Sequence, residues 1–114
     1  MTHQAQLLEH DRRPDAAGHV AQLRQVLALV EQIAGRPAPA VDTALDEAAR
    51  VGAAYADALP VTRRRFDALT AETVAWAAAG VEALTRAGGS RAAASRLADE
   101  LRETIESLLK LLKL

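Results

Sequence analysis

The sequence has 114 residues, of which half are apolar and a quarter are charged, and its net charge is −1. This balance excludes an intrinsically disordered chain, which needs few apolar residues and a high net charge. The apolar residues are mostly alanine (27) and leucine (16), with only three aromatic residues, and this shortage of β-branched and aromatic side chains excludes a β-sandwich or barrel. The absence of cysteine excludes a disulfide scaffold and any thiolate metal site.

Proline and glycine divide the chain into segments of helical character. Residues 1–13 are expected to form an N-terminal arm or a short helix, and residues 14–114 a single helical domain. The first helix of that domain is expected at about 15–34 and is amphipathic, because apolar residues recur there every three or four positions. Gly35 and Pro37 favour a stop after it. The residues that carry this spacing are Val20, Leu23, Leu27 and Val30.

The second helix is expected at about 39–59. Its apolar stripe contains two small residues, Ala48 and Gly52, one turn apart. Small side chains let the axes of two helices approach closely, because the interaxial distance depends on the residues at the contact. We therefore expect a neighbouring helix to pack against this part of the second helix.

The third helix is expected at about 61–87, with Pro60 at its first turn, where the missing N–H costs nothing. Phe66 and Trp76 share one apolar stripe on this helix, and their spacing predicts that both belong to the core. Thr70 equally suits a helix cap, which would predict a kink nearby.

The sequence Gly88-Gly89-Ser90 indicates the turn before the fourth helix, which is expected at about 91–112. Glycine commonly closes a helix in the left-handed conformation, and serine caps the next one. Short connections between consecutive helices favour antiparallel neighbours. The predicted fold is therefore all-α, an antiparallel four-helix bundle or helical hairpins that complete a core on dimerisation.

The end of the fourth helix is the most distinctive stretch, because its leucines extend beyond one face of the helix. An exposed apolar patch of this kind is typical of a surface that binds a partner. We expect a homodimer or a contact with another helical protein, and a membrane or hydrophobic particle is a further alternative. The predicted interface residues are Leu108, Leu109, Leu111, Leu112, Leu114, Ala48 and Gly52.

Two further motifs suggest other functions. Arg63, Arg64 and Arg65 form the densest run of positive charge, and such a run at the start of a helix suggests contact with phosphates of nucleic acid. The segment Glu9-His10-Asp11-Arg12-Arg13-Pro14 resembles the phosphoacceptor box of histidine kinases, which implies a small regulator that relays phosphate through His10. The neutral charge of the chain makes a nucleic-acid partner the weaker expectation.

The segment 65–73, with the sequence RFDALTAET, resembles a stretch common in phasins, the alanine-rich helical coat proteins of polyester storage granules. The resemblance covers nine residues of low complexity, so we assign no family from it. We expect a non-enzymatic module that acts by helix association, without a cofactor or metal. Twelve arginines against two lysines suggest a GC-rich bacterial genome, and the expected compartment is the cytoplasm.

Overall fold

A computed structural model describes residues 15–37 and 41–114 of the chain. Within these ranges the chain forms four helices, which are α2 (Ala16–Ile33), α3 (Val41–Asp57), α4 (Pro60–Arg86) and α5 (Arg91–Leu111). The predicted helices end within two residues of the observed ones. The four helices pack through long-range contacts, which confirms the prediction of an all-α four-helix bundle.

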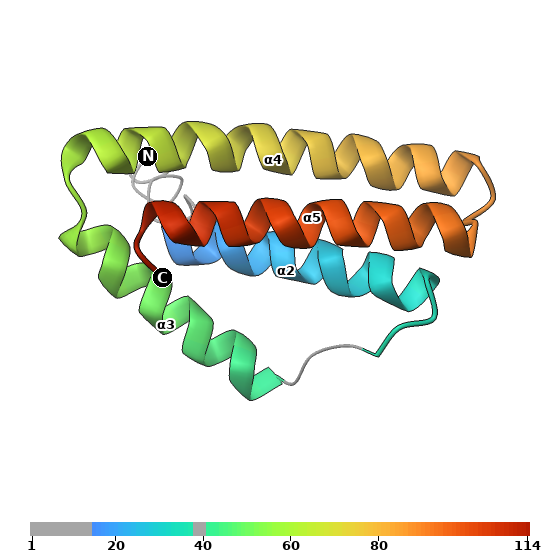
Figure 1. The fold of residues 1–114 in the computed structure, drawn as a ribbon, viewed down its shortest axis with the longest axis horizontal. Helices are drawn as coiled ribbons and strands as arrows, with labels where there is room; N and C mark the ends of the chain where they lie inside the picture. The colour runs from blue at the N-terminus through green and yellow to red at the C-terminus, as the bar shows by residue number, and fades with distance from the viewer. Residues whose placement is uncertain (1–14, 38–40) are drawn as a thin grey trace, which may run out of the picture.

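Helix α2 is the centre of the bundle, because it packs against each of the other three helices. Helices α2, α4 and α5 lie side by side, and α5 runs antiparallel to the other two (Figure 1). Helix α3 crosses at an angle and packs mainly against α2. Among residues 15–37 and 41–114, nothing else packs on the side of α2 that faces none of these three helices, and we call it the open side of α2.

The core is built mainly from α2, α4 and α5, and Val51 of α3 is also fully buried. Phe66 is the largest fully buried side chain, and it packs edge-on against the ring of Tyr55, with 5.8 Å between the ring centroids. Other large core residues come from α2, α4 and α5, and those of α2 have the spacing predicted from the sequence. They are Val20, Leu23, Leu27 and Val30 from α2, Leu84 from α4, and Leu101, Ile105 and Leu108 from α5.

Local signals place the helix ends. Asp15 caps α2 by accepting a hydrogen bond from the backbone N–H of Gly18 at 2.7 Å, and Ser90 caps α5 by accepting one from Ala93 at 3.4 Å. The turn between α4 and α5 contains Gly88 and Gly89, whose φ angles are +86° and +69°. Residues with side chains rarely adopt these angles, so the turn needs glycine. The predicted glycine turn with a serine cap is confirmed.

Two expectations for α4 were wrong. Thr70 is not a cap at a helix break, because α4 continues without interruption from Pro60 to Arg86. Its buried hydroxyl donates inside the helix to the carbonyl oxygens of Phe66 and Asp67, both at 2.9 Å. Such a contact often bends a helix, and the kink near Thr70 stays a prediction. Trp76 is 38% exposed and does not belong to the buried core. It lies about 100° around the helix from the buried Ala77, beyond the narrow strip that α2 and α5 cover.

Candidate interaction surface

The leucines at the end of α5 divide between the core and the surface. Leu108 and Leu112 are buried in the core of the chain itself, Leu109 and Leu111 are half-buried, and Leu114 is exposed. The two buried leucines therefore offer no surface to a partner while the bundle is folded. Their role in an interface stays a prediction, and only the remaining three leucines are accessible.

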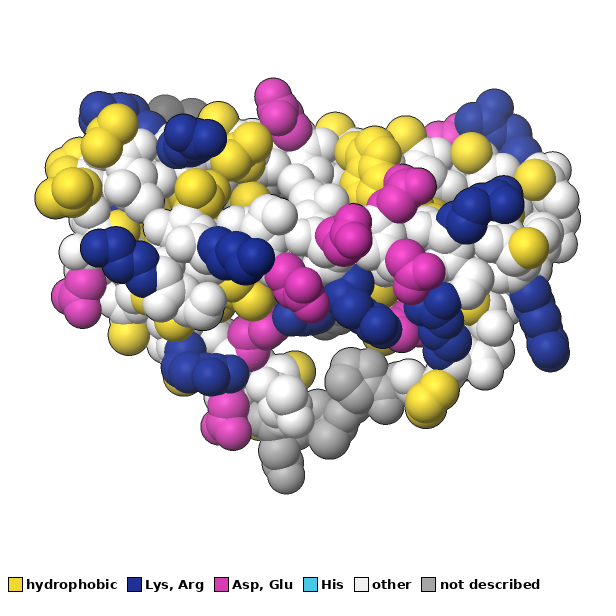
Figure 2. Space-filling view, viewed as in Figure 1, with side chains coloured by type: hydrophobic (Ala, Val, Ile, Leu, Met, Phe, Trp, Pro, Cys, Tyr) yellow, Lys and Arg dark blue, Asp and Glu magenta, His cyan; other side chains and the backbone are white. Residues whose placement is uncertain are grey.

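Two of these accessible leucines, Leu111 and Leu114, line a pocket where the end of α5 meets the α3–α4 turn. The pocket has a volume of about 360 Å3, and two of its lining residues, Leu59 and Leu114, are exposed. Apolar side chains also gather at this end of the molecule on the left of Figure 2. We call it the bundle-end pocket, and its lining residues are Ala54, Asp57, Ala58, Leu59, Thr62 and Leu111–Leu114.

The small residues of α3 face α2 of the same chain. Gly52 lies where an added Cβ would be 4.0 Å from the Cβ of Ala17, so the close approach that the sequence predicted here occurs within the monomer. Arg24 on α2 holds the same helix pair together by donating two hydrogen bonds of 2.8 Å to Glu47 on α3. The hydrogen bond to Glu47 raises the pKa of Arg24 above its ordinary value. Gly52 therefore already packs against α2, and Ala48 is half-buried.

A second apolar surface lies between α2 and α4. It is a groove of about 270 Å3 whose side chains are apolar except for one glutamine, and Leu29 stands exposed on its rim. We call it the α2–α4 groove, and its lining residues are Gln22, Leu23, Val26, Leu29, Val74, Ala77, Ala78 and Val81. All its lining residues come from α2 and α4, which run parallel, and none comes from α3 or α5.

The charges of α2 all point into the molecule. Helix α2 contains two charged residues, Arg24 and Glu31, and each is paired with another helix of the chain. The exposed positions on the open side of α2 are consequently uncharged. They are Gln22, Gln25, Leu29 and Gln32.

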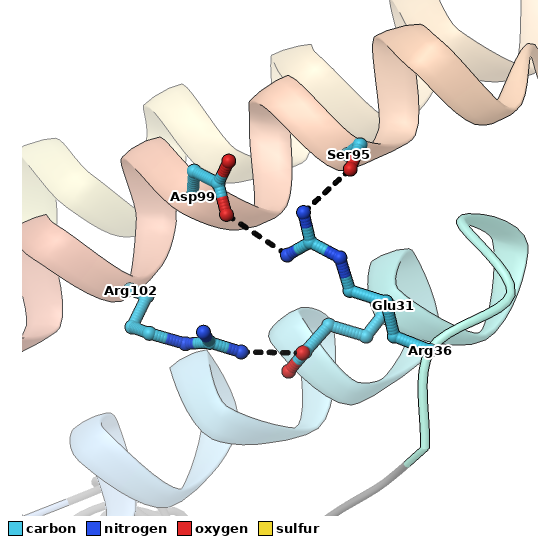
Figure 3. A network of polar contacts seen from close by, with 5 residues as sticks. All are labelled: Glu31, Arg36, Ser95, Asp99 and Arg102. Carbon is cyan, nitrogen blue, oxygen red and sulfur yellow. Dashed lines mark hydrogen bonds and ion pairs between the residues drawn. The ribbon is translucent and has the colours of Figure 1, made fainter.

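Figure 3 shows how the inward charges fasten α2 to α5. The buried carboxylate of Glu31 accepts a hydrogen bond from the guanidinium of Arg102 on α5. Arg36, just after α2, donates to Asp99 at 2.9 Å and to the hydroxyl of Ser95, both on α5. The hydrogen bond from Arg36 lowers the pKa of Asp99 below its ordinary value. These contacts hold α2 against α5. Because the charged groups in them are paired with one another, we assign them a structural role.

The arginine run lies in the first turns of α4. Arg63 is half-buried, whereas Arg64 and Arg65 are exposed. Consecutive residues project about 100° apart on a helix, so the three side chains leave α4 in different directions. The run does not form a convergent anion site, and nucleic-acid binding stays a prediction.

The proposed phosphoacceptor His10 lies outside the described residues, and its role also stays a prediction. Among residues 15–37 and 41–114, no group of three histidine, aspartate or glutamate side chains is placed to hold a metal ion. In the same part of the chain, no helix combines the length and apolar character needed to cross a membrane.

Comparisons with protein-family models, with curated proteins and with solved structures found no match to this chain. The function must therefore be argued from the surfaces themselves. Of these surfaces, sequence reasoning anticipated the leucine-rich end and missed the α2–α4 groove. A signal for it is present in the sequence, because glutamine and leucine occupy the positions of α2 where a solvated helix face normally carries charge.

Proposed function

We propose that the protein is a non-enzymatic helix-association module that pairs with a second copy of itself through the α2–α4 groove. The observation that carries this proposal is the combination of an apolar groove with a charge-free outer side of α2. Depletion of charged residues distinguishes the centre of a protein interface from the rest of the surface more reliably than bulk hydrophobicity does.

The bundle-end pocket is the second candidate surface, and the evidence that it binds a partner is weaker. Its rim carries Asp57 and Lys113, and much of its leucine surface is already packed inside the chain. The residues that line the α2–α4 groove are all uncharged, and the charged residue nearest the exposed side of α2 is Arg36, which lies beside Leu29 and Gln32. For this reason the α2–α4 groove is the preferred contact, and the predicted leucine interface becomes the alternative.

Three matched leucine-to-glutamate variants test the proposal by sedimentation velocity over a wide concentration range. Leu29 is 48% exposed in the groove, Leu114 is 47% exposed at the bundle end, and Leu45 is 66% exposed on α3, where it lines neither surface. We expect the wild type to dimerise and Leu29→Glu to weaken the dimer by about tenfold or more, because a buried unpaired charge is costly. Leu45→Glu is the control and leaves dimerisation unchanged.

The outcomes separate the alternatives. A wild type that remains monomeric at high micromolar concentration overturns the proposal, and binding of that monomer to lipid vesicles would favour the surface-binding alternative. Loss of the dimer in Leu114→Glu with an unchanged Leu29→Glu would move the interface to the bundle-end pocket. Circular dichroism of each variant checks that the helices remain folded.

A further inference from the structure

The outer side of α4, next to the α2–α4 groove, carries a row of exposed residues that all lie on one face of the helix. Their spacing is four, three, four, three and four residues, which is the spacing of neighbours along a helix face. The row begins with a basic residue, ends with an acidic residue, and has only alanine between them. Its members are Arg64, Ala68, Ala71, Ala75, Ala78 and Glu82.

This row is symmetric, because its spacing reads the same from either end. If a second copy of α4 lies antiparallel against it, each alanine meets an alanine, and Arg64 of each copy lies opposite Glu82 of the other. In the described part of the chain Arg64 has no ion-pair partner, and Glu82 pairs only with Arg86 on the exposed surface of the same helix. A parallel alignment would instead bring like charges together at both ends.

We propose that two copies of this chain associate through an antiparallel α4–α4 contact in this register, with reciprocal Arg64–Glu82 ion pairs at its two ends. The inference rests on the proposed function and adds the orientation and alignment of the partner. The small alanine side chains let the second α4 come close, so its flank also reaches the apolar α2–α4 groove beside the row. Glu72 lies about 100° around the helix from Ala71, on the flank away from α2, and stays outside the contact.

The size of the surface sets the expected strength. The row spans about 27 Å of helix at 1.5 Å per residue, and α2 adds a second helix about 8–10 Å away. Such a face covers roughly 500 Å2 on each copy, or roughly 1,000 Å2 in total, which is near the lower limit for a specific interface. The dimer should therefore be weak, with a dissociation constant of roughly micromolar magnitude.

Charge reversal tests the register without disturbing the core, because Arg64 and Glu82 are both exposed. Arg64→Glu alone and Glu82→Arg alone each create two repulsive contacts per dimer, so each should weaken dimerisation by about tenfold at low salt, and less at high salt. The double variant Arg64→Glu/Glu82→Arg restores both pairs and should dimerise like the wild type.

A mixing experiment gives a second readout. When the two single variants are combined in equal amounts, native mass spectrometry should show far more heterodimer than the 1:2:1 ratio of random pairing, because only the heterodimer has attractive pairs at both ends. Glu103→Arg is the matched control, since it reverses an exposed charge on the solvent side of α5. Mixed with Arg64→Glu, it should give no more heterodimer than random pairing does.

The results distinguish this inference from the proposed function. A wild type that is monomeric at all concentrations overturns both. A dimer that the single reversals do not weaken, that the double variant does not restore, or that shows no preference for the heterodimer, overturns the antiparallel register and leaves self-association standing.

Discussion

The ion pair between Glu31 and Arg102 should respond very differently to the loss of one partner or the other. The side chain of Glu31 is 5% exposed, whereas that of Arg102 is 46% exposed. Replacing Arg102 by methionine leaves a buried carboxylate without its hydrogen-bond donor. Replacing Glu31 by leucine leaves an arginine that can turn into water. The arginine substitution should therefore be much the more destabilising of the two.

The magnitude follows from the environment of the carboxylate. Breaking a fully buried ion pair by removing one partner costs about 3–5 kcal/mol. Two further arginines, Arg24 and Arg36, lie close enough to attract Glu31, and Arg102 is itself half in water. We therefore expect Arg102→Met to lower the free energy of unfolding by about 2 kcal/mol, the usual cost of an unsatisfied charged acceptor. Glu31→Leu should cost less than about 0.5 kcal/mol, because it removes the buried charge and leaves Arg102 free to turn into water.

Urea unfolding followed by circular dichroism measures these differences. Adding Glu31→Leu to Arg102→Met should recover most of the lost stability, since the double variant has no buried charge. Arg86→Met is the control, because Arg86 belongs to an exposed pair with Glu82 and its loss should cost under about 0.5 kcal/mol. The reasoning is refuted if Glu31→Leu costs as much as Arg102→Met, or if the double variant is no more stable than Arg102→Met alone.

Three further predictions concern local contacts. Burial and the hydrogen bond to Asp67 raise the pKa of Tyr55 above its ordinary 10.0. Tyr55 is the only tyrosine of the chain, so absorbance at alkaline pH should show it titrating at a higher pH than a free tyrosine does. Asp67→Asn should lower that titration pH, and the control Asp57→Asn should leave it unchanged. Because the folded-state pKa is the higher one, the stabilisation by the neutral phenol is complete below pH 10.0 and is lost as the pH rises through the folded-state value, which urea unfolding at alkaline pH would measure. Asp15→Ala should lower the melting temperature by removing a cap worth about 1 kcal/mol. Ser90→Ala should lower it less, because the cap hydrogen bond of Ser90 is 3.4 Å long and that of Asp15 is 2.7 Å long. Gly52→Ala should raise the free energy of unfolding by about 0.5–1 kcal/mol, since its new methyl group fits at 4.0 Å from Ala17, whereas Gly80→Ala, which meets Leu97 at 3.0 Å, should gain less.

The helices and most of the core could be predicted from the sequence, because local signals and the apolar period agree. The spacing of Val20, Leu23 and Leu27 identified the buried side of α2, and the glycines before Ser90 identified the last turn. Trp76 shows where this reasoning stops. A large apolar residue at helical spacing is buried only if a neighbouring helix covers its position, and that depends on how three helices meet.

The candidate surface was harder to predict for the same reason. Leucine-rich sequence marks apolar character, but the sequence alone does not say which leucines the chain buries within itself. Leu108 and Leu112 lie in the core. Leu29 lies in a segment that is not rich in leucine at its surface positions, yet it is exposed on the rim of a groove. The groove exists because α2 and α4 run parallel with α5 on one side only, which is a property of the packing and not of either helix.

The exposed sides of α2 and α5 have different chemistry, although both belong to the same bundle. Acidic and basic side chains cover the α5 side in Figure 2, whereas the open side of α2 has glutamine and leucine. Folding of the single chain does not explain the difference, because glutamate and lysine form helices as well as glutamine does and add favourable pairs on a solvated face. A covered face does explain it, since an amide costs less to remove from water than an unpaired charge. The argument for association therefore depends on which side chains α2 lacks as well as on the groove beside it.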